Sequence, residues 1–204
     1  MTSREPSPRT GGLMKDPIWV ESNDEKDAAR ALEMLHVQLI SAVIDPYSWK
    51  WVMVALHHAL QTFVLASLNR GEKAKVLEPR VTGEPLQVRY GGTDPYPEHQ
   101  PDYLSDLYER MKKATGFPSA AEVDPDVARM IEFRNALIQR IPDRWLLRVN
   151  DLPRMSRNCL KVVEYLGWNP GHIGWQKENL TDLARVKFLA SVKVLEALEG
   201  QYHA

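Results

Sequence analysis

Apolar residues recur at helical spacing through most of this chain, which predicts a protein built from α-helices. A first helix begins in the acidic cluster at residues 24–27, because negative side chains stabilise a helix N-terminus, and it ends before Pro46. The next helix, at about residues 47–69, is the most apolar segment and ends near Gly71. We expect this second helix to lie in the middle of the core.

Four later segments show the same helical pattern. The fourth predicted helix has the clearest start, with Asp124 as its N-cap and Pro125 at its first helical position. Asp151 and Pro153 repeat this arrangement before the fifth helix. The six predicted helices span about residues 24–45, 47–69, 104–115, 124–141, 151–167 and 180–199. The sequence therefore predicts an all-α bundle of five to six helices.

Two segments lack this pattern. Residues 1–20 are polar and rich in turn-forming residues, so we predict a disordered N-terminal tail. Residues from about 74 to 101 carry repeated Gly and Pro, which break helices, and we predict a long insert there. Alternating apolar residues at 86–90 predict a short edge strand inside this insert. The remainder, within residues 21–204, is predicted to form a single helical-bundle domain.

The composition excludes several classes of protein. The 204 residues contain 26 Lys and Arg against 27 Asp and Glu, and 44% are apolar, which supports a folded core. Cys159 is the single cysteine, which excludes a disulfide scaffold and a cysteine-rich zinc site. The apolar segment 49–68 contains Lys50 and His57, so we expect a core helix and no membrane span. The N-terminus has no signal-peptide pattern, which predicts a cytoplasmic protein.

Arg134 occupies an unexpected position in the fourth predicted helix. At about 100° per residue it lies at the centre of an apolar stripe formed by Val127, Met130, Ile131, Leu137, Ile138 and Ile141. A guanidinium on such a face needs a carboxylate, carbonyl oxygens or a ligand anion, because burying it unpaired costs several kcal/mol. The candidate carboxylates on other helices are Glu33, Asp106 and Glu109. Asn135 flanks the same stripe and adds an amide.

The segment from Arg134 through Asn135 to Gln139 resembles the motif of the HEPN superfamily, in which an Arg-Asn pair is followed by a His four residues after the Asn. The apolar helix that contains His57 and Gln61 is similar to an early core helix of bacterial proteins associated with this superfamily. The resemblance implies a bundle that dimerises through its motif helices. In active members it also implies a metal-independent ribonuclease, whose Arg stabilises phosphate charge and whose His performs acid–base chemistry.

Gln139 stands at the position of the motif His, and an amide cannot exchange a proton near neutral pH. The resemblance therefore implies a degenerate member in which Arg134 and Asn135 alone match the motif. His57 is the candidate spatial replacement for the missing His, on a polar face of the second helix shared with Lys50. That face carries no carboxylate and no H-E-x-x-H motif, so we predict no metal site, and we predict no cofactor.

Basic residues are concentrated around this helix. Residues 129–161 contain eight Lys or Arg and three Asp or Glu, a net charge of +5. Arginines suit bidentate phosphate contacts, and a tryptophan among them can stack on bases. The predicted RNA-contacting residues are Arg134, Gln139, Arg140, Arg144, Trp145 and Arg148. The alternative is a solvated surface whose acidic partners come from other segments.

Three functions follow from these observations. The first is a non-enzymatic, HEPN-like homodimer joined through the Arg134 helix, which binds RNA or another anion. The second is a toxin-like ribonuclease that uses Arg134 with a histidine from elsewhere. The third is an interaction module, in which Arg134 and its apolar stripe contact a protein partner.

Overall fold

The computed structural model describes residues 20–70, 104–118, 121–139, 146–168 and 172–203. These residues form six α-helices and one short 3-10 helix, so the prediction of an all-α bundle is confirmed. The elements are α1 (Asp24–Ile44), η1 (Pro46–Ser48), α2 (Trp49–Asn69), α3 (Leu104–Thr115), α4 (Val123–Gln139), α5 (Leu152–Trp168) and α6 (Glu178–His203). The predicted tail, the predicted insert and its edge strand lie outside the described residues, apart from Val20.

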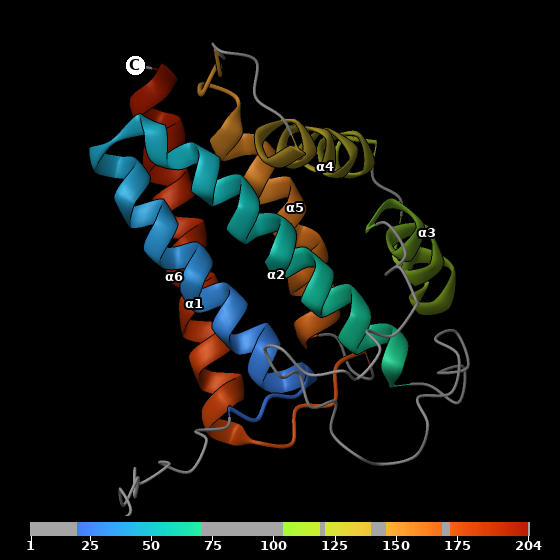
Figure 1. Cartoon of the computed structure of the whole chain (residues 1–204). Coiled ribbons are helices and arrows are strands. Elements are labelled where there is room, and N and C mark those ends of the chain that lie inside the picture. Colours follow the sequence, from blue (N-terminus) through green and yellow to red (C-terminus); the bar gives the residue numbers. More distant parts are fainter. Residues whose placement is uncertain (1–19, 71–103, 119–120, 140–145, 169–171, 204) are drawn as a thin grey trace, which may run out of the picture.

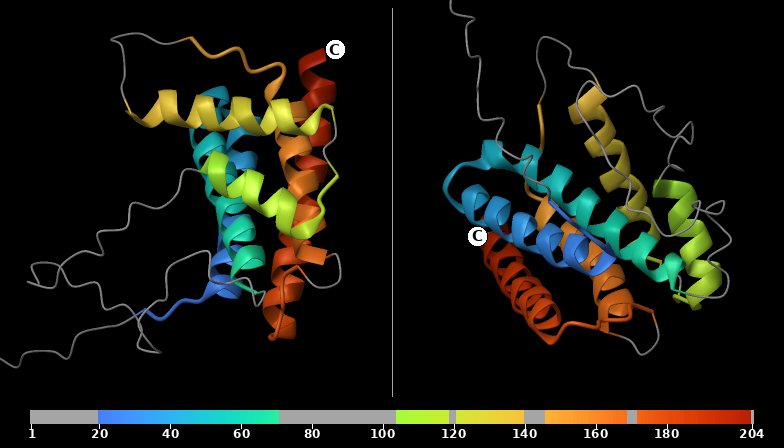
Figure 2. Two further views of the ribbon diagram at one scale, coloured as in Figure 1. Left: turned by 90° about the vertical axis from the view of Figure 1, so that its right-hand side faces the viewer. Right: turned by 60° about the horizontal axis from the view of Figure 1, so that its bottom comes forward.

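Helices α1, α2, α5 and α6 run side by side as a four-helix bundle, and α3 and α4 lie across one side of it (Figures 1 and 2). Helix α2 is central, because it packs against α1, α3, α4 and α5. Helix α6 closes the bundle against α1 and α5. The central position predicted for the second helix is therefore confirmed.

The polar residues around α1 explain its length. Asn23 caps the helix, since its side-chain oxygen accepts a hydrogen bond of 2.9 Å from the backbone N–H of Lys26. At the other end, the Asp45 side chain accepts a bond of 2.9 Å from the Tyr47 N–H, which starts η1 at Pro46. The chain therefore leaves α1 and enters α2 after one tight turn.

Helix α2 is long and apolar enough to cross a membrane by length and composition alone. In this fold it is a core helix, with Trp49, Leu56 and Phe63 among its fully buried residues. The Trp49 indole N–H donates a hydrogen bond of 3.0 Å to the Tyr202 hydroxyl on α6. The interior of the bundle therefore accounts for the apolar character of this segment.

Helix α4 begins at Val123, so the prediction of Asp124 as its N-cap is wrong. The Asp124 carboxylate instead accepts hydrogen bonds from the Tyr108 hydroxyl at 2.7 Å and from Lys112 Nζ at 3.0 Å, both on α3. A tertiary contact therefore uses the side chain that the local sequence pattern assigned to capping. The helix is described as far as Gln139, and Ile141 lies outside the described residues.

A buried carboxylate attaches α4 to the bundle. Asp126 accepts hydrogen bonds of 2.7 Å from Asn158 Nδ2 and 3.0 Å from Arg154 Nη1, both on α5. Asp126 and Asn158 are buried, while Arg154 reaches the surface. These bonds fix the first turns of α4 against α5 and so determine where the rest of α4 lies over α2.

Candidate functional site

The apolar stripe of α4 enters the core only in its first half. Val127 and Met130 are buried, Ile131 and Leu137 are half-buried, and the Ile138 side chain is 44% exposed. Arg134 lies at this boundary and is itself half-buried. The first half of the stripe therefore faces the core, while its second half reaches the surface and the guanidinium keeps access to solvent.

Arg134 has no carboxylate partner within ion-pair distance among the described residues. Its Nη1 donates a hydrogen bond of 3.0 Å to the side-chain oxygen of the adjacent Asn135. Of the carboxylates considered from the sequence, Glu33 pairs with Arg30 and Glu109 pairs with Lys112. The Asn135 amide thus orients the guanidinium without neutralising its charge.

His57 lies on α2, the helix that α4 crosses, and is 8% exposed. Its pKa is lowered to about 4, first because burial disfavours the imidazolium and then because the Arg134 guanidinium repels a second positive charge; His58 adds a smaller repulsion. The packing of α2 against α4 therefore places the charge of Arg134, whose side chain is bonded to Asn135, near enough to His57 to lower its pKa.

The charges in this cluster determine its chemistry. A histidine with a pKa of about 4 is neutral at pH 7, so His57 can accept a hydrogen bond or a proton but has no imidazolium proton to donate. Arg134 supplies several N–H donors in a planar fork, and one of them is committed to Asn135. A fixed cation beside a neutral polar ring is suited to holding an anion such as a phosphate.

The rest of the predicted RNA-contacting set is described only in part. Gln139 is the last residue of α4, and its side chain lies outside the described part of the structure. Arg140, Arg144 and Trp145 also lie outside it. Arg148 is described; its side chain is 76% exposed and forms an ion pair with Asp151. Among the described residues, no hydrogen bond or ion pair links Arg148 with Arg134.

Acidic residues from other segments neutralise part of the basic run at 129–161. Arg154 pairs with Asp126 at 3.0 Å, and Arg157 pairs with Glu199 on α6. Arg129 lies over the Phe133 ring, 5.3 Å from its centroid. The net positive charge of this region in the folded protein is thus smaller than the +5 counted over residues 129–161, because acids distant in sequence fold against it.

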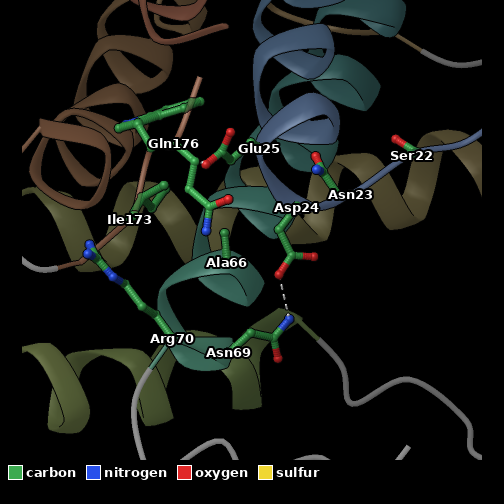
Figure 3. A pocket seen from close by; sticks show the side chains of 11 residues that line it. Ser22, Asn23, Asp24, Glu25, Ala66, Asn69, Arg70, Ile173 and Gln176 are labelled. Carbon is green, nitrogen blue, oxygen red and sulfur yellow. Dashed lines mark hydrogen bonds between the residues drawn. The ribbon is translucent and has the colours of Figure 1, made fainter. Parts of the chain in front are cut away.

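A pocket of about 520 Å³, which the sequence did not predict, lies at the end of the bundle where α1 begins and α2 ends (Figure 3). It is lined by Ser22, Asn23, Asp24, Glu25, Ala66, Asn69, Arg70, Ile173, Gly174, Trp175 and Gln176. The signal in the sequence is the turn at residues 171–175, in which two glycines precede Trp175, but no local pattern connects this turn with the start of α1. Within the described ranges, no three His, Cys, Asp or Glu side chains are grouped closely enough to hold a metal ion.

Comparisons with family models, with characterised proteins and with solved structures find no match to this chain.

Proposed function

We propose that this chain is a catalytically degenerate HEPN-like protein that binds RNA or another phosphate-bearing anion at Arg134 and does not cleave it. The support is the placement of an oriented guanidinium, without a carboxylate partner in the described part of the chain, on a half-exposed helix face. Phosphate oxygens are natural acceptors for such a group. The Arg134 cluster, defined as His57, Arg134 and Asn135, is the proposed binding site.

One observation favours binding over catalysis. Cleavage of a phosphodiester by acid–base chemistry needs a group that donates a proton to the leaving oxygen, and the best donors have a pKa near the working pH. Gln139 has no such proton, and the low pKa of His57 leaves its imidazole neutral. The Arg134 cluster thus has a charge for the phosphate and no general acid.

Binding and cleavage of a fluorescent single-stranded RNA test this proposal. We expect the wild type to bind with an affinity that falls steeply as salt is raised and to leave the RNA intact. Arg134→Ala should weaken binding about tenfold and lower the slope of log K against log salt by about one, as expected for the loss of one phosphate contact. Arg30→Ala is the matched control, because Arg30 is exposed and pairs with Glu33. Equal binding by wild type and Arg134→Ala would refute the proposed site.

A ribonuclease is the second candidate, because the charge of Arg134 is close enough to His57 to affect its pKa. In this case the wild type would cleave the RNA, and both His57→Gln and Arg134→Ala would abolish cleavage while binding by His57→Gln persisted. Gln139→His gives a complementary test of the family resemblance, because it restores the motif. If the chain is a catalytically degenerate HEPN-like protein, the wild type does not cleave RNA and Gln139→His gains cleavage.

We also propose that two copies associate through the surface half of α4. Ile138 is 44% exposed and Leu137 is half-buried, which leaves apolar area on the helix that carries Arg134. Ile138→Asp should convert a dimer into a monomer in sedimentation velocity. Leu189→Asp, at a similarly exposed apolar position on α6, is the control. If no RNA is bound or cleaved and α4 instead captures a different protein, the interaction-module alternative is favoured.

A further inference from the structure

The pocket at the end of the bundle is remote from the Arg134 cluster. Its walls come from the start of α1, the end of α2 and residues 173–176, which precede α6 (Figure 3). Along α2, Arg70 follows His57 by thirteen positions, which is about 20 Å at the helical rise. Its volume of about 520 Å³ is within the usual range of roughly 300–1,000 Å³ for small-molecule sites. The pocket is therefore large enough for a ligand of its own.

The positive charge of the pocket comes from Arg70, the residue that follows α2. Its guanidinium lies directly against the backbone of Gly174, since a Cβ atom at that glycine would be only 2.7 Å from Arg70 Cζ and Nε. Among the described residues, no carboxylate lies within ion-pair distance of Arg70. The missing side chain at position 174 is thus what makes room for this guanidinium.

The negative charge of the pocket comes from the first turn of α1. The Asp24 carboxylate accepts a hydrogen bond of 2.9 Å from Asn69 Nδ2, and the Glu25 carboxylate accepts one from the backbone N–H of Gln176. A carboxylate has about four acceptor positions, so these bonds orient both groups and leave capacity for a further donor. Figure 3 shows these carboxylates on a different side of the pocket from Arg70.

Trp175 also lines the pocket. The Trp175 indole N–H donates a hydrogen bond of 2.6 Å to the Gly167 carbonyl, and its ring stacks on Trp168 at a centroid distance of 6.5 Å. Both contacts hold the ring in place before any ligand arrives. The pocket therefore combines a preorganised apolar surface with a positively charged side chain, Arg70, and two negatively charged side chains, Asp24 and Glu25.

The geometry points to a small zwitterion as the ligand, of the short-peptide class, with its carboxylate on Arg70 and its ammonium group on Asp24 and Glu25. A simple anion would meet the Asp24 and Glu25 carboxylates, and a simple cation would meet the Arg70 guanidinium, so each would face repulsion from one wall. A molecule with separated charges of both signs satisfies both walls. Arg70 is suited to bidentate recognition of a terminal carboxylate, and the Trp175 ring is available to an apolar side chain.

Titration of the full chain with the dipeptide alanylalanine, followed through the indole N–H resonance of Trp175, tests this inference. We expect a saturable shift with a Kd in the millimolar range or below. The N-acetylated and the C-terminally amidated dipeptides each lack one charge and should bind at least tenfold more weakly. Absence of saturation by the free dipeptide, or equal binding of the capped forms, would overturn the proposal.

Three variants connect the binding to the named groups. Arg70→Gln and the double variant Asp24→Asn with Glu25→Gln should each reduce binding at least tenfold. Gly174→Ala should do the same, because its Cβ displaces the guanidinium, which is the flexible end of a side chain and can move without disturbing the core. Arg30→Gln, on the same helix as Asp24, should bind like the wild type. Unchanged binding by Arg70→Gln in a protein of wild-type melting temperature would refute the assigned site.

Discussion

The guanidinium of Arg134 on α4 acts on the imidazole of His57 on α2 across the contact between the two helices. Its charge is the second cause, after burial, of the low pKa of His57, about 4. The two residues are 77 positions apart in the chain. Their proximity connects the one arginine of the α4 stripe with the one buried histidine of the central helix.

This relationship predicts the effect of neutralising the arginine. In Arg134→Gln the pKa of His57 should rise, because the repulsion is removed, yet it should stay below 6.5 because burial remains the larger cause. Titration of the His57 Hε1 resonance by NMR measures this directly. The resonance is assigned by its absence in His57→Gln, and an unchanged pKa in Arg134→Gln would show that the two side chains do not interact.

The same pKa predicts how stability depends on pH. Because the folded-state pKa of His57 is about 4 and the unfolded value is 6.5, the unfolded chain binds more protons between these limits. The free energy of unfolding should therefore fall as pH is lowered from about 6.5 to 4, by up to ~3 kcal/mol from this residue. The pKa values of His36 and His172 are also lowered, so they add to the loss in the same direction.

Urea unfolding at pH 7.0 and at several lower pH values measures the free energy of unfolding of the wild type and of single histidine variants. The difference between the wild type and one variant gives the contribution of that histidine. His57→Gln should show a weaker loss of stability on acidification than the wild type. His203→Gln, at an exposed position near the end of α6, should follow the wild-type curve. An identical pH dependence for wild type and His57→Gln would mean that His57 is solvated in the folded protein.

Local signals in the sequence predicted most of the helices. The acidic start of α1 and the Asp45-Pro46 stop give its bounds within one residue, because capping and proline act over a few neighbouring residues. The start of α4 was displaced because Asp124 is bonded to α3. Helix α6 was predicted to end near residue 199 but continues to His203. Its added last turn contains Tyr202, which accepts a hydrogen bond from Trp49 on α2. Contacts between distant segments decided both differences.

The same distinction applies to the candidate sites. Helical periodicity singled out Arg134 and its neighbour Asn135, because that argument uses residues close in sequence. His57 was suggested as a spatial replacement for the missing motif His, and no local pattern placed it near α4. The acids that pair with Arg154 and Arg157 are 28 and 42 residues away, so no local pattern indicates them. The end-of-bundle pocket joins residues of α1, α2 and the segment before α6, and only the fold brings these together.

The buried carboxylate between α4 and α5 predicts an asymmetric pair of mutational effects. Asp126→Ala leaves the buried Asn158 amide without its 2.7 Å acceptor and removes the partner of Arg154, so it should cost about 2–4 kcal/mol of stability. Arg154→Ala should cost less than about 1 kcal/mol, because that side chain is 43% exposed. Denaturant unfolding of both variants measures the difference, and equal costs would contradict a central role for Asp126.

Two glycines in helices provide the last prediction, because the same substitution should have opposite effects on stability. A Cβ at Gly167 in α5 would lie 2.8 Å from Cε1 of Phe63 on α2. Phe63 is fully buried, and its ring contacts the rings of Trp168 and Trp175. The ring has no free space to move into, so Gly167→Ala should destabilise the protein by about 1–3 kcal/mol. A Cβ at Gly200 in α6 meets no described atom within 4 Å, so Gly200→Ala should stabilise the helix by roughly 0.5–1 kcal/mol. Melting temperatures should therefore fall for the first variant and rise for the second; a rise for both would show that α5 is packed less tightly against Phe63 than this structure has it.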